Sequence, residues 1–164
     1  MMAYVDCPHL AGAAPTDLVV NERIAAARAR CEAAGERWTP PRARTYELLL
    51  RADGPARAYD LVAGFGPHGG SAKPPTVYRA LDFLLELGLA HRLVSRNMFV
   101  ACAGPGAPHD AQFLICDCCM RAFELDLGAH AIAAAAARER DFVLTRWMAE
   151  ATGLCPNCHE AWAE

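Results

Sequence analysis

The feature that most constrains the fold of this 164-residue chain is a pair of Cys-x-x-Cys motifs in its last third. Cys116 and Cys119 form the first motif, and Cys155 and Cys158 form the second. Two residues between paired cysteines let one turn present both thiolates to the same ion, and four thiolates complete the tetrahedral shell of structural zinc. The sequence therefore predicts that a zinc ion holds the C-terminal part of the chain together.

Other interpretations of these cysteines stay open. Cys118 could replace Cys119 as a ligand, although adjacent residues usually point in different directions. The run Cys155-Pro156-Asn157-Cys158-His159 also matches the attachment pattern for c-type haem, which requires export to an oxidising compartment. A redox pair is a further alternative, but such a pair usually follows a strand at the start of a helix rather than lying near a chain end.

Composition indicates a folded protein in a reducing compartment. The chain is 54% hydrophobic and 21% charged, which is a globular balance, and it contains eight cysteines. No apolar stretch reaches the roughly 18 residues that cross a bilayer, and residues 1–7 lack the basic and apolar regions of a signal peptide. We therefore expect a cytoplasmic protein with no membrane partner, in which thiols bind metal rather than form disulfides.

The N-terminal part predicts helices followed by a hairpin. Residues 1–20 show no periodicity and are expected to form a mobile tail, after which Asn21 caps a helix that stops at Gly35. Thr39 before Pro40 opens a second helix, to about residue 52, with three residues inward: Tyr46, Leu49 and Leu50. A short helix is expected over 58–63 and a longer one from 74 to Gly88. Strand-like runs at 89–94 and 98–102 complete the pattern.

This layout is typical of a winged helix-turn-helix, whose longer helix enters the major groove of DNA. Residues 21–97 carry 12 Lys/Arg against 8 Asp/Glu, whereas residues 98–164 carry 4 against 9, so only the first half is net positive. A basic half is a weak pointer to nucleic acid. The alternative is a small helical domain that binds another protein.

The C-terminal part changes character after a Gly- and Pro-rich linker at 103–110. Strands are expected at 111–115, 121–125 and 142–149, with an alanine-rich helix at 129–140 between the last two. This unit has only about 60 residues, and a unit of that size usually needs a metal or a partner subunit for stability. The fold class is α+β, with a winged helix followed by a small C-terminal α/β domain.

A second set of metal-binding side chains straddles the linker: His91, Cys102, His109 and Glu124. One thiolate, two imidazoles and one carboxylate suit tetrahedral zinc. Each residue also has an ordinary interpretation, as a surface histidine, a small buried residue, a loop residue or a solvated charge.

Several motifs resemble the zinc uptake regulators of the ferric uptake regulator superfamily, in the same order over roughly residues 21–160. The strongest is the recognition-helix run Ala72-Lys73-Pro74-Pro75-Thr76-Val77-Tyr78-Arg79-Ala80-Leu81-Asp82-Phe83-Leu84-Leu85-Glu86. The others are Thr39-Pro40-x-Arg42, Ala58-Tyr59-Asp60-Leu61, Phe113-x-Ile115-Cys116-Asp117-x-Cys119 and Gly153-Leu154-Cys155-x-x-Cys158. Cys118, Met120 and the glycine-rich stretch at 64–70 depart from the family pattern.

The resemblance implies a homodimeric repressor that binds a double-stranded DNA operator. It implies a winged-helix domain at 21–102, a hinge at 103–110 and a dimerisation and metal-binding domain at 111–164. The paired cysteines correspond to a structural zinc site, and His91, Cys102, His109 and Glu124 to a regulatory one, giving about two zinc ions per subunit. The Cys102 thiolate favours zinc over iron, although an iron or peroxide sensor of the same superfamily is the main alternative.

The resemblance also suggests DNA contacts from Tyr59, Thr76, Tyr78 and Arg79, although the tyrosines could instead pack in the core. Zinc in the regulatory site would fix the wing to the C-terminal domain, so that the two recognition helices match a palindromic operator and zinc-uptake genes are repressed. A zinc enzyme fits poorly, because a full ligand set leaves no open position and no catalytic residue or small-molecule substrate is evident. Cys7 and His9 could add a further metal site.

Overall fold

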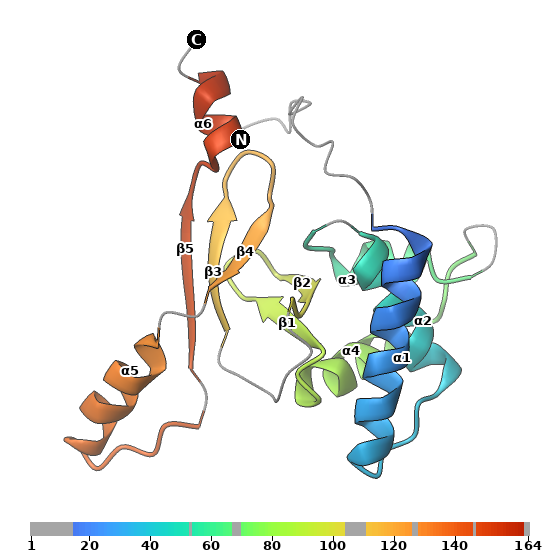
Figure 1. Cartoon of the computed structure of the whole chain (residues 1–164), viewed down its shortest axis with the longest axis horizontal. Coiled ribbons are helices and arrows are strands. Elements are labelled where there is room, and N and C mark those ends of the chain that lie inside the picture. Colours follow the sequence, from blue (N-terminus) through green and yellow to red (C-terminus); the bar gives the residue numbers. More distant parts are fainter. Residues whose placement is uncertain are drawn as a thin grey trace. The chain divides into compact units, whose positions relative to one another are not determined.

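The computed structural model describes residues 15–52, 54–66, 70–103, 111–125, 128–145 and 147–162. The chain divides into two compact units, which the described residues 15–103 and 111–162 represent. Figure 1 labels the helices and strands of both units. Among the described residues, no helix is both long and apolar enough to cross a membrane.

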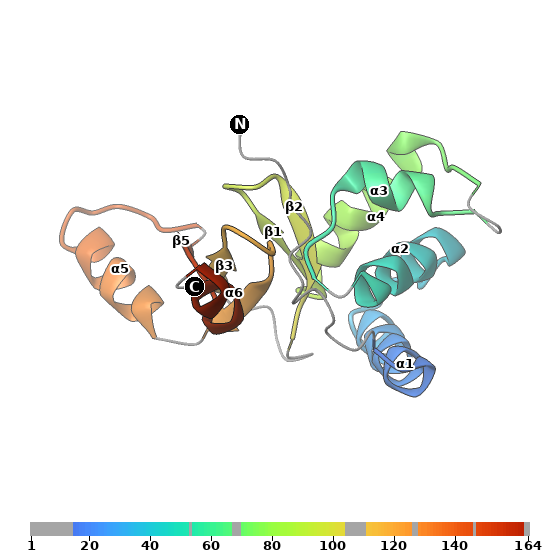
Figure 2. The ribbon, with the colours of Figure 1, turned by 90° about the horizontal axis from the view of Figure 1, so that it is seen from above.

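The N-terminal unit contains four helices and a two-stranded hairpin. The helices are α1 (Asp17–Ala33), α2 (Pro40–Arg51), α3 (Ala58–Ala63) and α4 (Pro74–Glu86), and the strands are β1 (Ala90–Leu93) and β2 (Met98–Ala101). α2 packs against α1, α3, α4 and β2, while α4 also contacts α3 and β1. Figure 2 shows α3 and α4 side by side, as in a helix-turn-helix, with the hairpin following α4.

Local signals explain most of these boundaries. Thr39 is the N-cap of α2 and Pro40 its first residue, as predicted, although the Thr39 side chain makes no capping hydrogen bond. α3 has the predicted bounds, and α4 ends before Gly88, whose φ of 63° suits glycine. The antiparallel hairpin pairs His91 with Val100 and Leu93 with Met98.

One core holds this unit together. Helical spacing on α2 and α4 buries the predicted side chains, including Tyr46 and Leu49 on α2 and Leu81 and Leu84 on α4. Phe83 is also buried, and the Arg42 guanidinium carbon lies 3.2 Å from the centre of its ring. α4 is therefore fixed to α2 along one face, which leaves its opposite face to solvent.

The prediction of a mobile tail over residues 1–20 is wrong for its last residues. α1 begins at Asp17 rather than after Asn21, because the Thr16 hydroxyl caps the helix by accepting from the Val19 N–H at 3.4 Å. Val20 is fully buried in the core, so tertiary packing extends the helix toward the N-terminus. Residues 1–14 of the predicted tail lie outside the described residues.

The C-terminal unit is built on a three-stranded sheet in the order β4-β3-β5. Its elements are β3 (Ala111–Cys116), β4 (Ala122–Leu125), α5 (Ala129–Arg138), β5 (Met148–Gly153) and α6 (Pro156–Trp162). The central strand, β3, pairs antiparallel with β4 and parallel with β5. Because β4 and β5 pair with opposite edges of β3, the chain between them crosses from one side of β3 to the other, and α5 lies in that connection.

The last strand was predicted in the wrong place. The apolar run that begins at Phe142 suggested a strand over 142–149, but residues 142–145 form no regular element, and Phe142 and Val143 are exposed. β5 instead spans Met148–Gly153, where its backbone pairs with β3 although its side chains are mostly exposed. The position of β5 in the sequence is therefore determined by backbone pairing with β3 rather than by side-chain hydrophobicity. α6 was not predicted.

Candidate metal centres and DNA-reading surface

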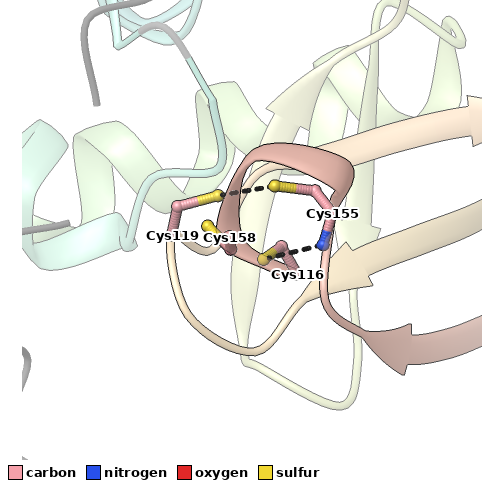
Figure 3. Close-up of side chains that lie close together, drawn as sticks. All are labelled: Cys116, Cys119, Cys155 and Cys158. Carbon is pink, nitrogen blue, oxygen red and sulfur yellow. Dashed lines mark hydrogen bonds between the residues drawn. The ribbon is translucent and has the colours of Figure 1, made fainter. Parts of the chain in front are cut away.

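The two cysteine pairs form one cluster in the C-terminal unit. The sulfur atoms of Cys116, Cys119, Cys155 and Cys158 all lie within 4.8 Å of one another. The Cys119 and Cys155 Sγ atoms are 3.8 Å apart, and the four side chains converge in Figure 3. None of the four is in a disulfide.

Backbone pairing brings together two motifs that are far apart in the sequence. Cys116 ends β3 and is paired with Gly153, the last residue of β5, and the Asp117 N–H donates to the Gly153 carbonyl at 2.7 Å. The turn after β3 closes when the Met120 N–H donates to the Cys116 carbonyl, with Met120 at a φ of 61°. Cys155 directly precedes α6, which carries Cys158. The first pair therefore lies on the turn after β3 and the second at the start of α6, at the same end of the sheet.

The electrostatics of the cluster favour a thiolate at Cys116. Burial of this thiol opposes ionisation, but backbone N–H groups of Cys155, Cys119 and Cys118 donate to its sulfur and lower its pKa to about 6. The Cys155 N–H lies 3.3 Å from the Cys116 Sγ. Burial, together with hydrogen bonds to the Cys116 and Cys155 thiols, raises the pKa of Cys119 to about 11.

The donor set fits zinc. A tetrahedron with zinc–sulfur bonds of about 2.3 Å has edges of about 3.8 Å, which is the distance between the Cys119 and Cys155 sulfur atoms. Four soft thiolates are also the ligands that zinc takes in closed structural sites. Cys118 is half-buried and packs against the cluster, but the structure brings Cys119, not Cys118, into the set of four.

Two of the predicted regulatory ligands lie together in the N-terminal unit. His91 is on β1 and Cys102 directly follows β2; both are buried, and their ligand atoms lie within 4.8 Å of each other. The Cys102 N–H donates to the Leu89 carbonyl at 3.0 Å. The Arg23 guanidinium, on α1, donates to the Cys102 carbonyl. The backbone of Cys102 is thus held from two elements.

The remaining predicted ligands belong to the C-terminal unit or lie outside the described residues. Glu124 is a partly buried residue on β4, in the C-terminal unit. His109, Cys7 and His9 lie outside the described residues. A regulatory site that combines His91, Cys102, His109 and Glu124 therefore stays a prediction, as does a further site at Cys7 and His9.

The predicted DNA-reading residues lie on α3 and α4 and reach solvent. Tyr59 on α3 is 78% exposed and Tyr78 on α4 is 50% exposed, so the alternative that these tyrosines pack in the core is wrong. Arg79 is exposed and Thr76 is partly exposed on the same helix as Tyr78. Such a face offers hydrogen-bond donors and aromatic rings of the kind that contact phosphates and base edges.

Comparison with known proteins places the chain in a family. No protein-family model matches the chain. A zinc uptake regulation protein of Escherichia coli (strain K12) is 39% identical over 145 residues, covering 87% of this chain and 85% of the relative. The chain belongs to the zinc uptake regulators.

Solved structures of zinc uptake regulators have the same fold as this chain. A zinc uptake regulator complexed with zinc and DNA is 38% identical, with a TM-score of 0.84 over 92% of this chain and 100% of that chain. Holo XcZur is 39% identical, with a TM-score of 0.79 over 85% and 99% of the two chains. The predicted α+β fold with an N-terminal winged helix is confirmed.

Sequence analysis did not single out four basic residues, of which two precede the predicted DNA-reading helices and two hold backbone carbonyls. Arg57 and Lys73 are exposed N-cap residues of α3 and α4. Arg23 and Arg44 bind backbone carbonyls of other elements. Arg57 and Lys73 directly precede helices that the sequence predicts, so their place at the start of each helix could have been predicted. Nothing local in the sequence indicates the contacts of Arg23 or Arg44.

Proposed function

We propose that this chain is a zinc-sensing transcriptional repressor. As a homodimer loaded with zinc, it binds a palindromic operator in double-stranded DNA and represses genes for zinc uptake. The observation that carries the proposal is that a single unit combines an exposed Tyr78–Arg79 face on α4 with a buried His91–Cys102 pair at the hairpin. The same unit thus offers a DNA surface and soft metal ligands.

The tetrathiol cluster is the structural zinc site in this proposal. Zinc bound there supplies the cross-link that the small C-terminal unit needs. Cys116, Cys119, Cys155 and Cys158 form a closed set with no position for substrate, which supports a structural rather than an enzymatic role. With the regulatory site, this gives about two zinc ions per subunit.

The regulatory site is formed by His91, Cys102, His109 and Glu124. Support comes from the buried His91–Cys102 pair and from the chemistry of the four side chains, which suits zinc better than iron because one donor is a thiolate. His91 and Cys102 belong to the winged helix, whereas Glu124 belongs to the C-terminal unit. Sharing one ion would tie the wing to the C-terminal domain, and the dimer would then present its two α4 helices at the spacing of the operator.

Thr76, Tyr78, Arg79 and Tyr59 are the proposed DNA contacts. Arg79 can donate two hydrogen bonds to a guanine edge or bind a phosphate, while exposed Arg57 and Lys73 add phosphate contacts at the starts of α3 and α4. By linkage, zinc strengthens operator binding by the same factor by which the operator strengthens zinc binding. A DNA-binding role implies residence in the cytoplasm, with no enzymatic substrate.

Operator binding at controlled free zinc tests this function. A duplex is selected from a randomised pool with the zinc-loaded protein, and its affinity is measured by fluorescence anisotropy with zinc and with a chelator that leaves the tetrathiol zinc in place. We expect a palindromic duplex, and at least about tenfold weaker binding in chelator, in the usual range of allosteric coupling. Equal affinity in both conditions would refute zinc sensing.

A further inference from the structure

The connection between the two DNA-reading helices is unusually rich in glycine. α3 ends at Ala63 and α4 begins at Pro74, and Gly64, Gly66, Gly69 and Gly70 lie between them. Glycine has more backbone freedom to lose than any other residue, so a connection of this composition does not by itself fix the separation of two helices. Contacts from elsewhere in the unit must do so.

Arg44 on α2 makes such contacts. Its Nε donates to the Phe65 carbonyl at 2.9 Å, and its Nη2 donates to the Gly64 carbonyl at 3.0 Å. Carbonyl groups at the C-terminal end of a helix lack a hydrogen-bond partner within the helix. Arg44 donates to the two carbonyl groups that directly follow α3, those of Gly64 and Phe65. The planar guanidinium can bridge two neighbouring oxygen atoms because its donors have a fixed fork geometry.

Other charged side chains hold Arg44 in this position. The Arg44 Nη1 donates to Glu47 Oε2 at 3.0 Å, and Arg51 Nε donates to Glu47 Oε1 at 2.9 Å. Arg51 also donates to Asp17 Oδ1, on α1, at 2.8 Å. The Arg44 and Glu47 side chains are only 34% and 27% exposed. The bridge to the connection is therefore part of a network that extends from α1 through α2.

The described residues on the two sides of positions 67–69 also contact one another. The Gly66 N–H donates to the Gly70 carbonyl, and a Cβ at Gly66 would lie 2.7 Å from that oxygen. The Ala72 N–H donates to the Val62 carbonyl at 3.0 Å, which ties the start of α4 back to α3. With Arg44 holding Gly64 and Phe65, both sides of the glycine-rich stretch are fixed.

We propose that Arg44 is a positioning residue for DNA recognition, because its guanidinium anchors the end of α3 to α2 and so sets the separation between α3 and α4. This inference rests on the proposed function, since it concerns the same DNA surface. Arg44 acts through Tyr59 on α3 and through the residues of α4, not by reading DNA itself.

Three variants of the zinc-loaded protein test the inference. Arg44→Met keeps the apolar stem and removes both hydrogen bonds, while Arg44→Lys keeps the charge but cannot bridge two carbonyls. Arg28→Met is the matched control, because the pair that Arg28 forms with Glu32 on α1 is exposed and its replacement removes the same charge from the same unit. If the competent connection is populated about one-tenth of the time without the bridge, affinity for the selected duplex falls about tenfold per protomer.

We expect both Arg44 variants to bind the duplex at least about tenfold more weakly than Arg28→Met, at unchanged zinc content. Amide hydrogen exchange at Gly66 and Ala72 should also accelerate by about tenfold in both. If Arg44→Lys binds the duplex as tightly as the wild-type protein, Arg44 only attracts phosphate. If amide exchange at Gly66 and Ala72 is unchanged, Arg44 does not hold the connection. Either result overturns the inference. If the wild-type protein selects no duplex, the proposed function is refuted. The exchange measurement needs no DNA, so it tests the Arg44 bridge independently of that function.

Discussion

Replacing Cys158 with serine should unfold the C-terminal unit and leave the winged helix folded. Cys158 is fully buried, and its sulfur is one of four that converge at the end of the sheet. Serine offers a harder, more weakly binding oxygen, so the variant loses one of four thiolates and with it the closed shell that zinc requires.

The size of the effect follows from how little else holds this unit together. Among the described residues of 111–162, the buried apolar side chains other than cysteine are Phe113, Ile115 and Ala137. Burial of the two larger ones contributes about 3–6 kcal/mol together. Structural zinc in small domains contributes about 10–16 kcal/mol at neutral pH. The metal term is the larger one, and without it the apolar core within one subunit is too small to offset the loss of chain entropy.

Thermal unfolding monitored by circular dichroism, together with zinc content, measures this effect. We expect Cys158→Ser to lose the transition of the C-terminal unit and its tetrathiol zinc, while the transition of the N-terminal unit, with its own core, persists. Cys118→Ser is the matched control, since Cys118 packs against the cysteine cluster but lies outside the set of four, and it should keep both zinc and transition. A Cys158→Ser protein that loses zinc yet keeps a cooperative C-terminal transition would refute the reasoning.

Three further predictions concern the N-terminal unit. Cys102→Ser should abolish most of the zinc stimulation of operator binding while the tetrathiol zinc stays bound, measured by anisotropy in zinc buffers; an unchanged zinc response would remove Cys102 from the regulatory site. Arg79→Ala should cost about 1–3 kcal/mol of operator-binding free energy if Arg79 contacts a base, with no change in thermal midpoint because the side chain is exposed; an effect no larger than that of Arg28→Ala would exclude a base contact. Leu84→Ala should lower the free energy of unfolding by about 2–5 kcal/mol in urea titrations, because Leu84 is fully buried in the core. Leu18→Ala, at a site 68% exposed, is its control and should change stability by no more than about 0.5 kcal/mol.

The N-terminal helices could be predicted because their signals are local. Thr39 with Pro40, the spacing of Leu81 and Leu84, and Gly88 each act within a few residues of the boundary they set. The failures involve distant partners. Val20 joins the core that α2 and α4 build, which extends α1 beyond its predicted start, and β5 owes its existence to pairing with β3.

The candidate sites divide in the same way. The thiolate chemistry and the two-residue spacing of each cysteine pair are properties of the sequence, because spacing within a single turn does not depend on the rest of the fold. Whether Tyr59 and Tyr78 face solvent or the core is not local, since it depends on which helix faces the other helices cover. The structure leaves both tyrosines exposed.

By itself the sequence determined the kinds of ligand, the order of the N-terminal elements and the family of the chain. Only the tertiary structure decided that Cys119 and Cys155, 36 residues apart, meet at 3.8 Å, because parallel pairing of β3 with β5 brings the two turns to one end of the sheet. It also decided that Arg44 reaches Gly64 and Phe65, through α2 packing beside α3. Contacts of this kind depend on where whole elements lie, which short-range patterns do not encode.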